Sequence, residues 1–192
     1  MVKPVVVIQG HPDPAGGHLC HALADAYVAG AAAAGHTVER VEVAQLDFPM
    51  LRSAVEFESG AVPPDIKAAQ AAIMRADHLV LVYPLWLGTM PALFKAFLEQ
   101  CFRPGFALDT DGMWDELLAG KSARVVVTMG MPAPFYRWYY GAHSLKSLER
   151  NILGFVGIAP IRESLFGGVE AVSDAKRAKW LKKMEALGRK GE

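Results

Sequence analysis

The 192-residue chain shows two patterns of hydrophobic residues, short apolar runs and longer segments with apolar residues at helical spacing. Short β-branched runs without polar interruption are typical of strands that a sheet buries on both faces. One run, residues 37–43, alternates strictly and indicates an outer strand. Five strands are predicted in all, at Pro4–Gln9, Thr37–Val43, His78–Tyr83, Ala123–Met129 and Pro160–Phe166.

Segments with apolar residues at helical spacing separate these strands. Helices are predicted over residues 19–34, 66–76, about 89–101, 143–155 and from 173 onward. Asp65, Thr89 and Ser173 are the expected N-caps. Gly35 is the expected C-cap of the first helix. Residues 44–64 are predicted to be irregular.

Strands that alternate with helices predict a parallel sheet covered by helices on both faces, an α/β fold. No internal repeat or linker interrupts the alternation, so residues 1–192 are expected to form a single domain. Ligands of such sheets bind beyond the carboxyl ends of the strands, where the strand order reverses. We therefore expect the functional residues in the loops after the first, third and fourth strands.

The composition of the chain argues against several classes of function. The 20 basic and 20 acidic residues give a net charge of zero, which argues against a nucleic-acid partner. The apolar runs are well short of the roughly 20 residues that a membrane-spanning helix needs. Cys20 and Cys101 lie far apart and are expected to be reduced thiols in a soluble, cytoplasmic protein. The six histidines show no metal-ligand spacing, and no G-x-S-x-G hydrolase motif occurs in the sequence.

The first loop, Gly10–His18 (GHPDPAGGH), joins a strand to a helix. Glycines at a helix start suit an anion, because backbone N–H groups and the helix dipole point toward it. His11 and His18 could add charge or hydrogen bonds. The spacing is neither that of a dinucleotide-binding fingerprint nor that of a P-loop. A plain Pro/Gly turn with surface histidines is an equal alternative.

The second and third loops are rich in large apolar side chains. Residues 83–91 place Leu85, Trp86 and Leu87 between a strand and a helix, which favours a flat ligand over a simple plug of the core. Residues 128–143 carry five aromatic side chains, which indicate a cover for a planar ligand or a subunit interface. Together, the three loops predict an apolar slot with a phosphate site at one end. A flavin would need such a site.

Residues 83–108 (YPLWLGTMPALFKAFLEQCFRPGFAL) resemble the flavodoxin-like NAD(P)H:quinone oxidoreductases, the family that includes DT-diaphorase and the bacterial modulators of drug activity. That family has a Pro-Ala-x-Leu-Lys helix start at this point, and here Phe94 replaces the usual Leu. The resemblance extends over residues 4–187. It implies a flavodoxin-like fold, a five-stranded parallel sheet with the order 2-1-3-4-5 and helices on both faces.

The resemblance also implies the site residues. The residues that it assigns to flavin binding are His11, His18, Leu19, Cys20, Pro84, Leu85, Trp86, Leu87, Gly88, Thr128, Met129, Gly130, Met131 and Tyr136. Tyr136 and His143 match the catalytic pair of the family, which lies near the flavin and helps relay charge when hydride enters or leaves. Hydrogen-bond donors aimed at the flavin would lower that barrier, because hydride transfer leaves negative charge on the ring.

The function implied is a flavin-dependent NAD(P)H oxidoreductase that reduces quinones or related electrophiles by ping-pong hydride transfer. It would hold FAD or FMN, use NAD(P)H as co-substrate and form a homodimer. One alternative is a flavin-bound regulatory subunit of a potassium-efflux transporter. A one-electron flavodoxin-type carrier is disfavoured, because such carriers are strongly acidic and lack the aromatic loop. The sequence leaves open FMN or FAD, NADH or NADPH, and the electron acceptor.

Overall fold

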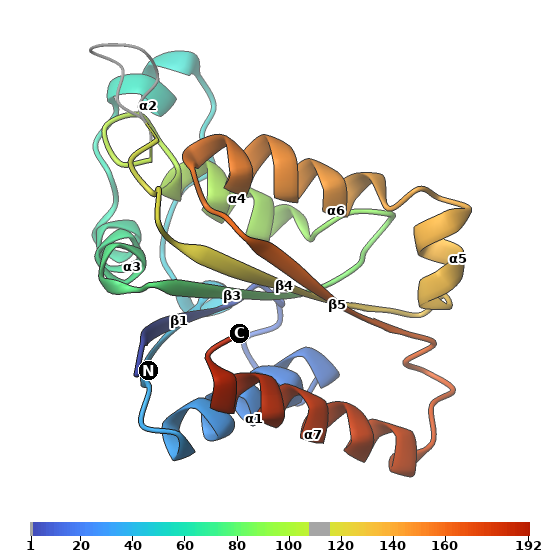
Figure 1. The fold of residues 1–192 in the computed structure, drawn as a ribbon. Coiled ribbons are helices and arrows are strands. Elements are labelled where there is room, and N and C mark those ends of the chain that lie inside the picture. Colours follow the sequence, from blue (N-terminus) through green and yellow to red (C-terminus); the bar gives the residue numbers. More distant parts are fainter. Residues whose placement is uncertain (1, 108–115) are drawn as a thin grey trace.

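A computed structural model describes residues 2–107 and 116–192, and Leu108, at the end of the segment that carries the resemblance, lies outside them. Five parallel strands form one sheet in the order β2-β1-β3-β4-β5 (Figure 1). The strands are β1 (Pro4–Gln9), β2 (Thr37–Glu42), β3 (His78–Pro84), β4 (Ser122–Met129) and β5 (Ile161–Gly167). The predicted sheet and its strand order are therefore confirmed.

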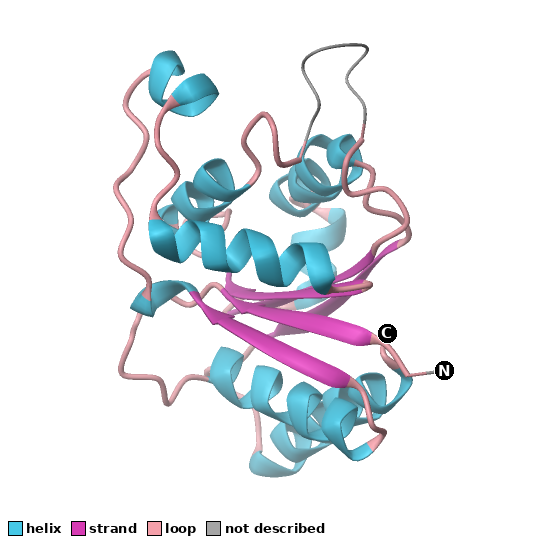
Figure 2. Cartoon of the chain, turned by 90° about the vertical axis from the view of Figure 1, so that its left-hand side faces the viewer, coloured by secondary structure: helices cyan, strands magenta, loops and turns pink. Residues whose placement is uncertain are grey.

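The helices lie in two layers, with α1 and α7 below the sheet of Figure 1 and α4 and α6 above it; Figure 2 shows the same layers from the side. The α-helices are α1 (Leu19–Ala33), α2 (Ala54–Ser59), α3 (Pro64–Arg75), α4 (Ala92–Cys101), α5 (Ala133–Trp138), α6 (His143–Ser147) and α7 (Asp174–Lys190). The shorter turns are η1 (Val43–Gln45), the π-helical η2 (Leu148–Leu153) and η3 (Gly154–Val156). The helix predicted over residues 143–155 is therefore one continuous helical segment, which is α-helical first, then π-helical and finally 3₁₀-helical.

The unbroken apolar runs of the strands follow from this double coverage. Val6 and Ile8 of β1 face one core, and Val5 and Val7 face the other. Successive side chains of a strand point to opposite faces, so a strand covered on both sides needs apolar residues at every position.

Two helix starts differ from the prediction. α4 begins at Ala92, after Pro91 as its N-cap, and Thr89 does not cap it. α3 begins at Pro64, so Asp65 lies inside its first turn rather than before it. Proline suits the start of a helix because its φ is fixed near the helical value and it lacks the N–H that would be left unpaired.

The last helix starts as predicted. The hydroxyl oxygen of Ser173 accepts a hydrogen bond from the backbone N–H of Lys176, 3.3 Å away, and α7 begins at the next residue, Asp174. This helix crosses α1 in close contact. A Cβ on Gly30 would lie 2.0 Å from the carbonyl oxygen of Glu185, and one on Gly188 would lie 2.1 Å from that of Tyr27.

The segment predicted to be irregular, residues 44–64, contains the short helix α2. Arg103 is 3% exposed, and its guanidinium donates hydrogen bonds to the carbonyl oxygens of Glu56, Phe57 and Gly60. A cation here complements the carbonyl groups at the carboxyl end of the helix. The helix therefore depends on a residue more than 40 positions away.

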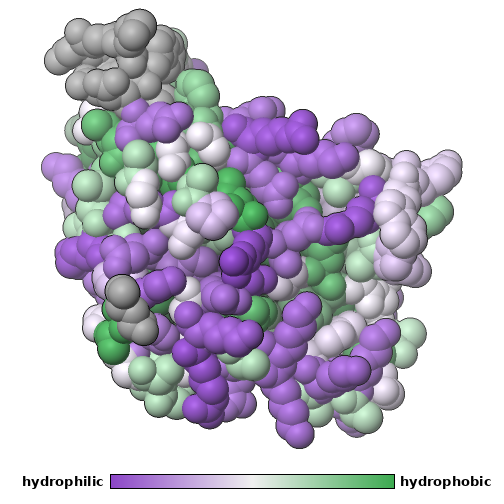
Figure 3. Space-filling model, in the orientation of Figure 1, coloured by the Kyte–Doolittle hydropathy of each residue, from purple (hydrophilic) through white to green (hydrophobic). Residues whose placement is uncertain are grey.

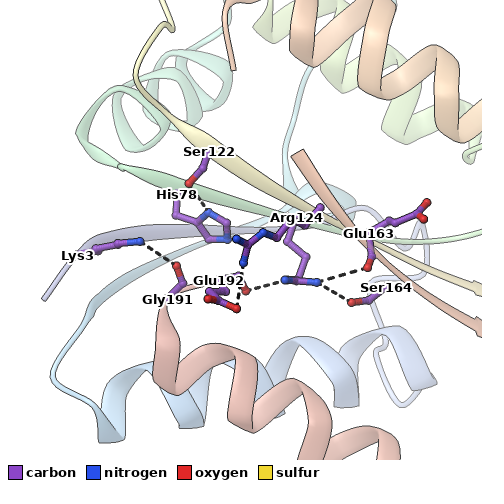
Figure 4. Close-up of polar contacts among 9 residues, drawn as sticks. Lys3, His78, Ser122, Arg124, Glu163, Ser164, Gly191 and Glu192 are labelled. Atoms are coloured by element: carbon purple, nitrogen blue, oxygen red, sulfur yellow. Dashed lines mark hydrogen bonds and ion pairs between the residues drawn. The ribbon is translucent and has the colours of Figure 1, made fainter. Parts of the chain in front are cut away.

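The carboxyl end of α7 is fastened near the amino ends of the strands (Figure 4). Arg124, 5% exposed, donates to the carbonyl oxygen of Glu192 at 2.8 Å and to the hydroxyl of Ser164 at 2.9 Å. His78 lies beside it, with its Nδ1 2.8 Å from the hydroxyl of Ser122. This cluster lies near the amino ends of the strands, at the end of the sheet opposite the predicted functional loops.

Within residues 2–107 and 116–192, no helix combines the length and apolarity needed to cross a membrane. The face of the molecule in Figure 3 is mainly hydrophilic, with smaller hydrophobic patches between the hydrophilic residues.

Candidate functional site

The three predicted loops meet at the carboxyl ends of the central strands. The N–H of Gly10 donates to the carbonyl oxygen of Val82, and the N–H of Leu85 donates to that of Thr128, both at 2.7 Å. A Cβ on Gly10 would lie 2.6 Å from the ring of Phe94. Only glycine therefore lets the first loop leave β1 so close to α4.

The first loop ends in a helix start without side-chain caps. α1 begins at Leu19 with His18 as its N-cap, and among the described residues no side chain accepts a hydrogen bond from its first turn. That turn also contains no acidic residue. The N–H of His21 already donates to the carbonyl oxygen of His18 at 3.0 Å, and an anion bound here would satisfy the N–H groups that precede it. The backbone of His18, Leu19 and Cys20 thus lies where a phosphate was predicted.

Three histidine rings gather beside this helix start. His11, 6% exposed, stacks on His18 with ring centroids 4.0 Å apart, and His21 lies 5.1 Å from His11. Burial and, to a smaller extent, the neighbouring rings lower the pKa of His11 to about 4. Its Nδ1 accepts from the N–H of Asp13 at 3.2 Å, so Nε2 carries the proton of the neutral ring.

The floor under these histidines is polar and buried. Gln9 is 1% exposed, and its Oε1 accepts from the N–H of His11 at 3.0 Å. Its Nε2 has no partner among the described residues. A buried amide N–H group without a partner costs stability, so a ligand oxygen above it would compensate.

Two predicted contact residues turn away from the ligand space. The Cys20 Sγ lies 3.1 Å from the Thr128 Oγ1, and this contact joins α1 to β4. Burial raises the pKa of Cys20 to about 12, so its thiol stays neutral. Only the backbone of Cys20 remains available to a phosphate.

The second loop is a tight hairpin. Trp86 and Thr89 exchange backbone hydrogen bonds of 2.8 and 3.0 Å. Leu87 and Gly88 between them have φ values of 46° and 80°. Positive φ at both central residues is the mark of a type I′ turn, which glycine accommodates readily. Leu87 is fully exposed at the tip, Leu85 is half-buried, and Pro84 is buried at the base.

Trp86 does not plug the core. Its side chain is 51% exposed, and its ring lies edge-on to His11 with the centroids 5.9 Å apart. A large exposed aromatic ring beside an anion site offers a surface for a planar group. The structure therefore brings the first and second loops together, as predicted.

In the third loop, the carbonyl oxygens of Met129 and Met131 accept hydrogen bonds from the N–H groups of Val169 and Gly168, at 3.3 and 3.0 Å. Because a trans peptide points its N–H opposite to its C=O, the N–H of Gly130 points away from Val169. Met131 is followed by a proline, which has no N–H. This turn therefore offers fewer donors than a glycine-rich turn would.

The two predicted catalytic residues lie on α5 and α6, and they differ in how far their side chains are exposed. Tyr136 is 2% exposed, and its hydroxyl lies 2.7 Å from the hydroxyl of Ser144 and accepts from the N–H of Leu145 at 3.3 Å. His143 is exposed, with its ring over Gly141, where a Cβ would lie 2.8 Å from Nε2.

A hollow of about 640 Å³, mostly apolar, lies between the hairpin and α6. Trp86 and Leu87 line one side, and His143, Ser144 and Ser147 line the other. Tyr136 stands behind Ser144. The sequence interpretation missed Ser144, because no pattern singles out a serine that follows a histidine.

The hollow, the exposed tryptophan and the helix start next to it suit a cofactor with a planar ring and a phosphate. A second hollow of about 340 Å³ lies on the other side of His21, where Arg40 pairs with Asp25 and Glu42. The described residues contain no group of three side chains placed to hold a metal ion. The fold and the site thus define a doubly wound α/β protein of the flavodoxin type.

A family model for the flavodoxin-like fold matches residues 3–187, and the chain belongs to this family. It is 30% identical over 138 residues to an uncharacterized NAD(P)H oxidoreductase of Haemophilus influenzae, covering 69% of this chain and 68% of the relative. It is 31% identical over 128 residues to an FMN-dependent NADH:quinone oxidoreductase of Ruegeria pomeroyi, covering 58% of this chain and 63% of the relative.

Among solved structures, the NAD(P)H:quinone oxidoreductase from Methanothermobacter marburgensis has the same fold, with a TM-score of 0.82 and 24% identity over 98% of this chain and 96% of that one. The resemblance inferred from the sequence is confirmed by these comparisons. The chain spans less than two thirds of some relatives, such as 61% of the human ribosyldihydronicotinamide dehydrogenase [quinone], with 26% identity over 68% of this chain.

Proposed function

We propose that this chain is a flavin-dependent NAD(P)H oxidoreductase that reduces quinones or related electrophiles by ping-pong hydride transfer. The observation that carries the proposal is the exposed Trp86 ring, which lines the hollow opposite His143 and lies 5.9 Å from the ring of His11, near the uncapped start of α1. When bound, a flavin would accept hydride from the nicotinamide and pass it to the second substrate. The names of the relatives support an oxidoreductase rather than the regulatory subunit of a transporter.

Different residues of the chain would bind the phosphate, cover the ring and donate a hydrogen bond to the reacting group. The N–H groups at the start of α1, with His11 and His18, would bind the flavin phosphate. Trp86 and Leu87 would cover the ring and exclude water. His143, at the opposite wall, would donate a hydrogen bond where negative charge develops during transfer.

We further propose that the protein acts as a homodimer. α5 and the residue after it expose Phe135, Trp138 and Tyr139, which are 46%, 79% and 72% accessible, and Tyr140 beyond them is 50% accessible. Aromatic side chains are enriched at subunit interfaces. Light scattering should give twice the mass of the chain, whereas a monomer at tens of micromolar would contradict the dimer. The buried free thiols of Cys20 and Cys101 are consistent with a cytoplasmic location.

The test begins with the cofactor. Purified protein should be yellow, and chromatography after denaturation should identify FMN or FAD. Oxidation of NADH and NADPH with menadione as acceptor then measures activity. A protein that binds neither flavin after reconstitution would contradict the proposed function.

Two variants test the site. His143→Ala should lower kcat on the order of 100-fold, because it removes a hydrogen-bond donor from the transition state. Trp86→Ala should weaken flavin binding by up to about 10-fold through lost aromatic contact. Lys182→Ala, on the exposed side of α7, is the control and should match the wild type.

A further inference from the structure

Ser144 occupies a position that the predicted catalytic pair does not account for. Its side chain lines the hollow, next to His143. Its hydroxyl oxygen also lies 2.7 Å from the hydroxyl oxygen of Tyr136, which is buried behind it. The tyrosine hydroxyl therefore reaches the hollow only through this serine.

The direction of the hydrogen bond follows from the third group in the cluster. The N–H of Leu145 donates to the Tyr136 hydroxyl oxygen at 3.3 Å. A phenol is a stronger acid than an alkyl alcohol, so the Tyr136 hydroxyl donates the hydrogen bond and Ser144 Oγ accepts it. The Ser144 proton is then free to point into the hollow.

Such a chain strengthens its last donor. Each hydrogen bond polarises the next, so the run from the Leu145 N–H through Tyr136 to Ser144 makes the serine a better donor than an isolated hydroxyl. The walls around it are mostly apolar, and in such surroundings a hydrogen bond to a charged acceptor gains strength.

We propose that Ser144 is the hydroxyl group that hydrogen-bonds an anionic oxygen in the hollow during the reaction, and that Tyr136 is a positioning residue that acts through Ser144. The inference rests on the proposed function and deepens it. The oxygen belongs either to the carbonyl of the reduced flavin or to the quinone as it accepts hydride. Both sources share the chemistry of a developing oxyanion.

The experiment compares Ser144→Ala, Ser144→Thr, Tyr136→Phe and the double variant Ser144→Ala/Tyr136→Phe in the flavin-loaded protein. Ser144→Ala should lower kcat/KM by about 10- to 100-fold for the substrate whose half-reaction forms the oxyanion, as expected for one hydrogen bond to a charged group. That substrate is NAD(P)H if the oxygen is the flavin's, and menadione if it is the quinone's. Ser144→Thr retains the hydroxyl and should restore most of the activity. Tyr136→Phe should reduce activity in the wild type and have no further effect in Ser144→Ala.

Two measurements distinguish the sources of the oxyanion. If the oxygen belongs to the flavin, Ser144→Ala should make the reduction potential of the bound flavin more negative, whatever the acceptor. If it belongs to the quinone, the potential stays unchanged and only reoxidation by the quinone slows in stopped flow. Either result supports the proposal.

Ser147→Ala is the matched comparison, because Ser147 lines the same wall and has no hydrogen bond to Tyr136 among the described residues. Its effect should multiply with that of Tyr136→Phe. The proposal is overturned if Ser144→Ala leaves both the potential and kcat/KM unchanged while flavin is bound, or if Tyr136→Phe acts equally in both backgrounds. Should Tyr136→Phe not fold, Ser144→Ala and Ser144→Thr decide alone. A protein without flavin would instead overturn the proposed function.

Discussion

His18 is held by a carboxylate, with its Nε2 2.7 Å from the Oδ2 of Asp13. The hydrogen bond with His18 lowers the pKa of Asp13, so the carboxylate is ionised and accepts a hydrogen bond from the Nε2–H group. In the neutral ring Nδ1 is then an acceptor, and it can donate toward a phosphate only when His18 is protonated. His11, stacked 4.0 Å away, is neutral near pH 7, because burial lowers its pKa to about 4.

The affinity for FMN should fall as pH rises above about 4, the value to which burial lowers the pKa of His11 in the protein without ligand. A bound phosphate favours protonated rings, so binding takes up protons, and each linked proton changes the affinity by up to about tenfold per pH unit. Asp25 and Glu42 face His21 and favour its protonation, whereas burial of His21 opposes it and lowers its pKa. Quenching of flavin fluorescence measures the affinity.

Riboflavin, which lacks the phosphate, is the control ligand and should bind with little dependence on pH. His11→Asn should flatten the FMN profile, because the amide stays neutral. Equal slopes for FMN and riboflavin would contradict the role assigned to the histidines.

For single residues, the sequence predicted which side chains lie close together but not the directions in which these side chains point. His11 and Trp86 do meet, because the ends of neighbouring parallel strands meet at one edge of the sheet. Cys20 and Thr128 bond each other instead of facing a ligand, and Tyr136 is buried. Such orientations depend on packing between distant segments, which no local pattern records.

Among the elements, the long helices and all five strands were predictable, and the short helices α2 and α5 were not. Each has six residues, fewer than two turns, and shows too little periodicity to detect. α2 also needs Arg103 from beyond α4. The aromatic residues after β4 suggested a loop, although part of that segment winds into a helix.

The crossing of α1 and α7 gives a prediction about stability. Gly188→Ala should destabilise the fold by about 1–3 kcal/mol, because the new methyl group would overlap the backbone of Tyr27 and force the helices apart. Thermal or urea unfolding measures the change. Lys182→Ala on the exposed face of α7 is the control, and equal stability of the two variants would show that the helices can separate without cost.

In the whole molecule, the order of the strands was predicted by the family resemblance, and the alternation of strands and helices predicted the covered sheet. The cluster around Arg124 was not predicted, because its partners come from β3, β5 and the end of α7. It concentrates positive charge in the interior. Burial, reinforced by the charges of Arg124 and Lys3, lowers the pKa of His78 to about 4.

Stability should consequently fall as pH decreases from about 6.5 to 4. In this window the unfolded chain binds a proton at His78 and the folded protein does not, so acid favours unfolding by up to roughly 3 kcal/mol. His11 acts in the same direction. Unfolding free energies at pH 7.5 and pH 5 should differ less in His78→Asn than in the wild type. Parallel pH profiles would contradict the role of His78.

The hairpin at Trp86–Thr89 has a consequence for the speed and strength of binding. Its two-residue turn matches the natural twist of the paired segments, so the loop is ordered without a ligand. A flexible wall would lose conformational entropy on closing over a ring, at about 1–2 kcal/mol for each backbone residue that becomes fixed. Here that loss occurs during folding. The exchange of one planar substrate for the next can then proceed against a preorganised surface.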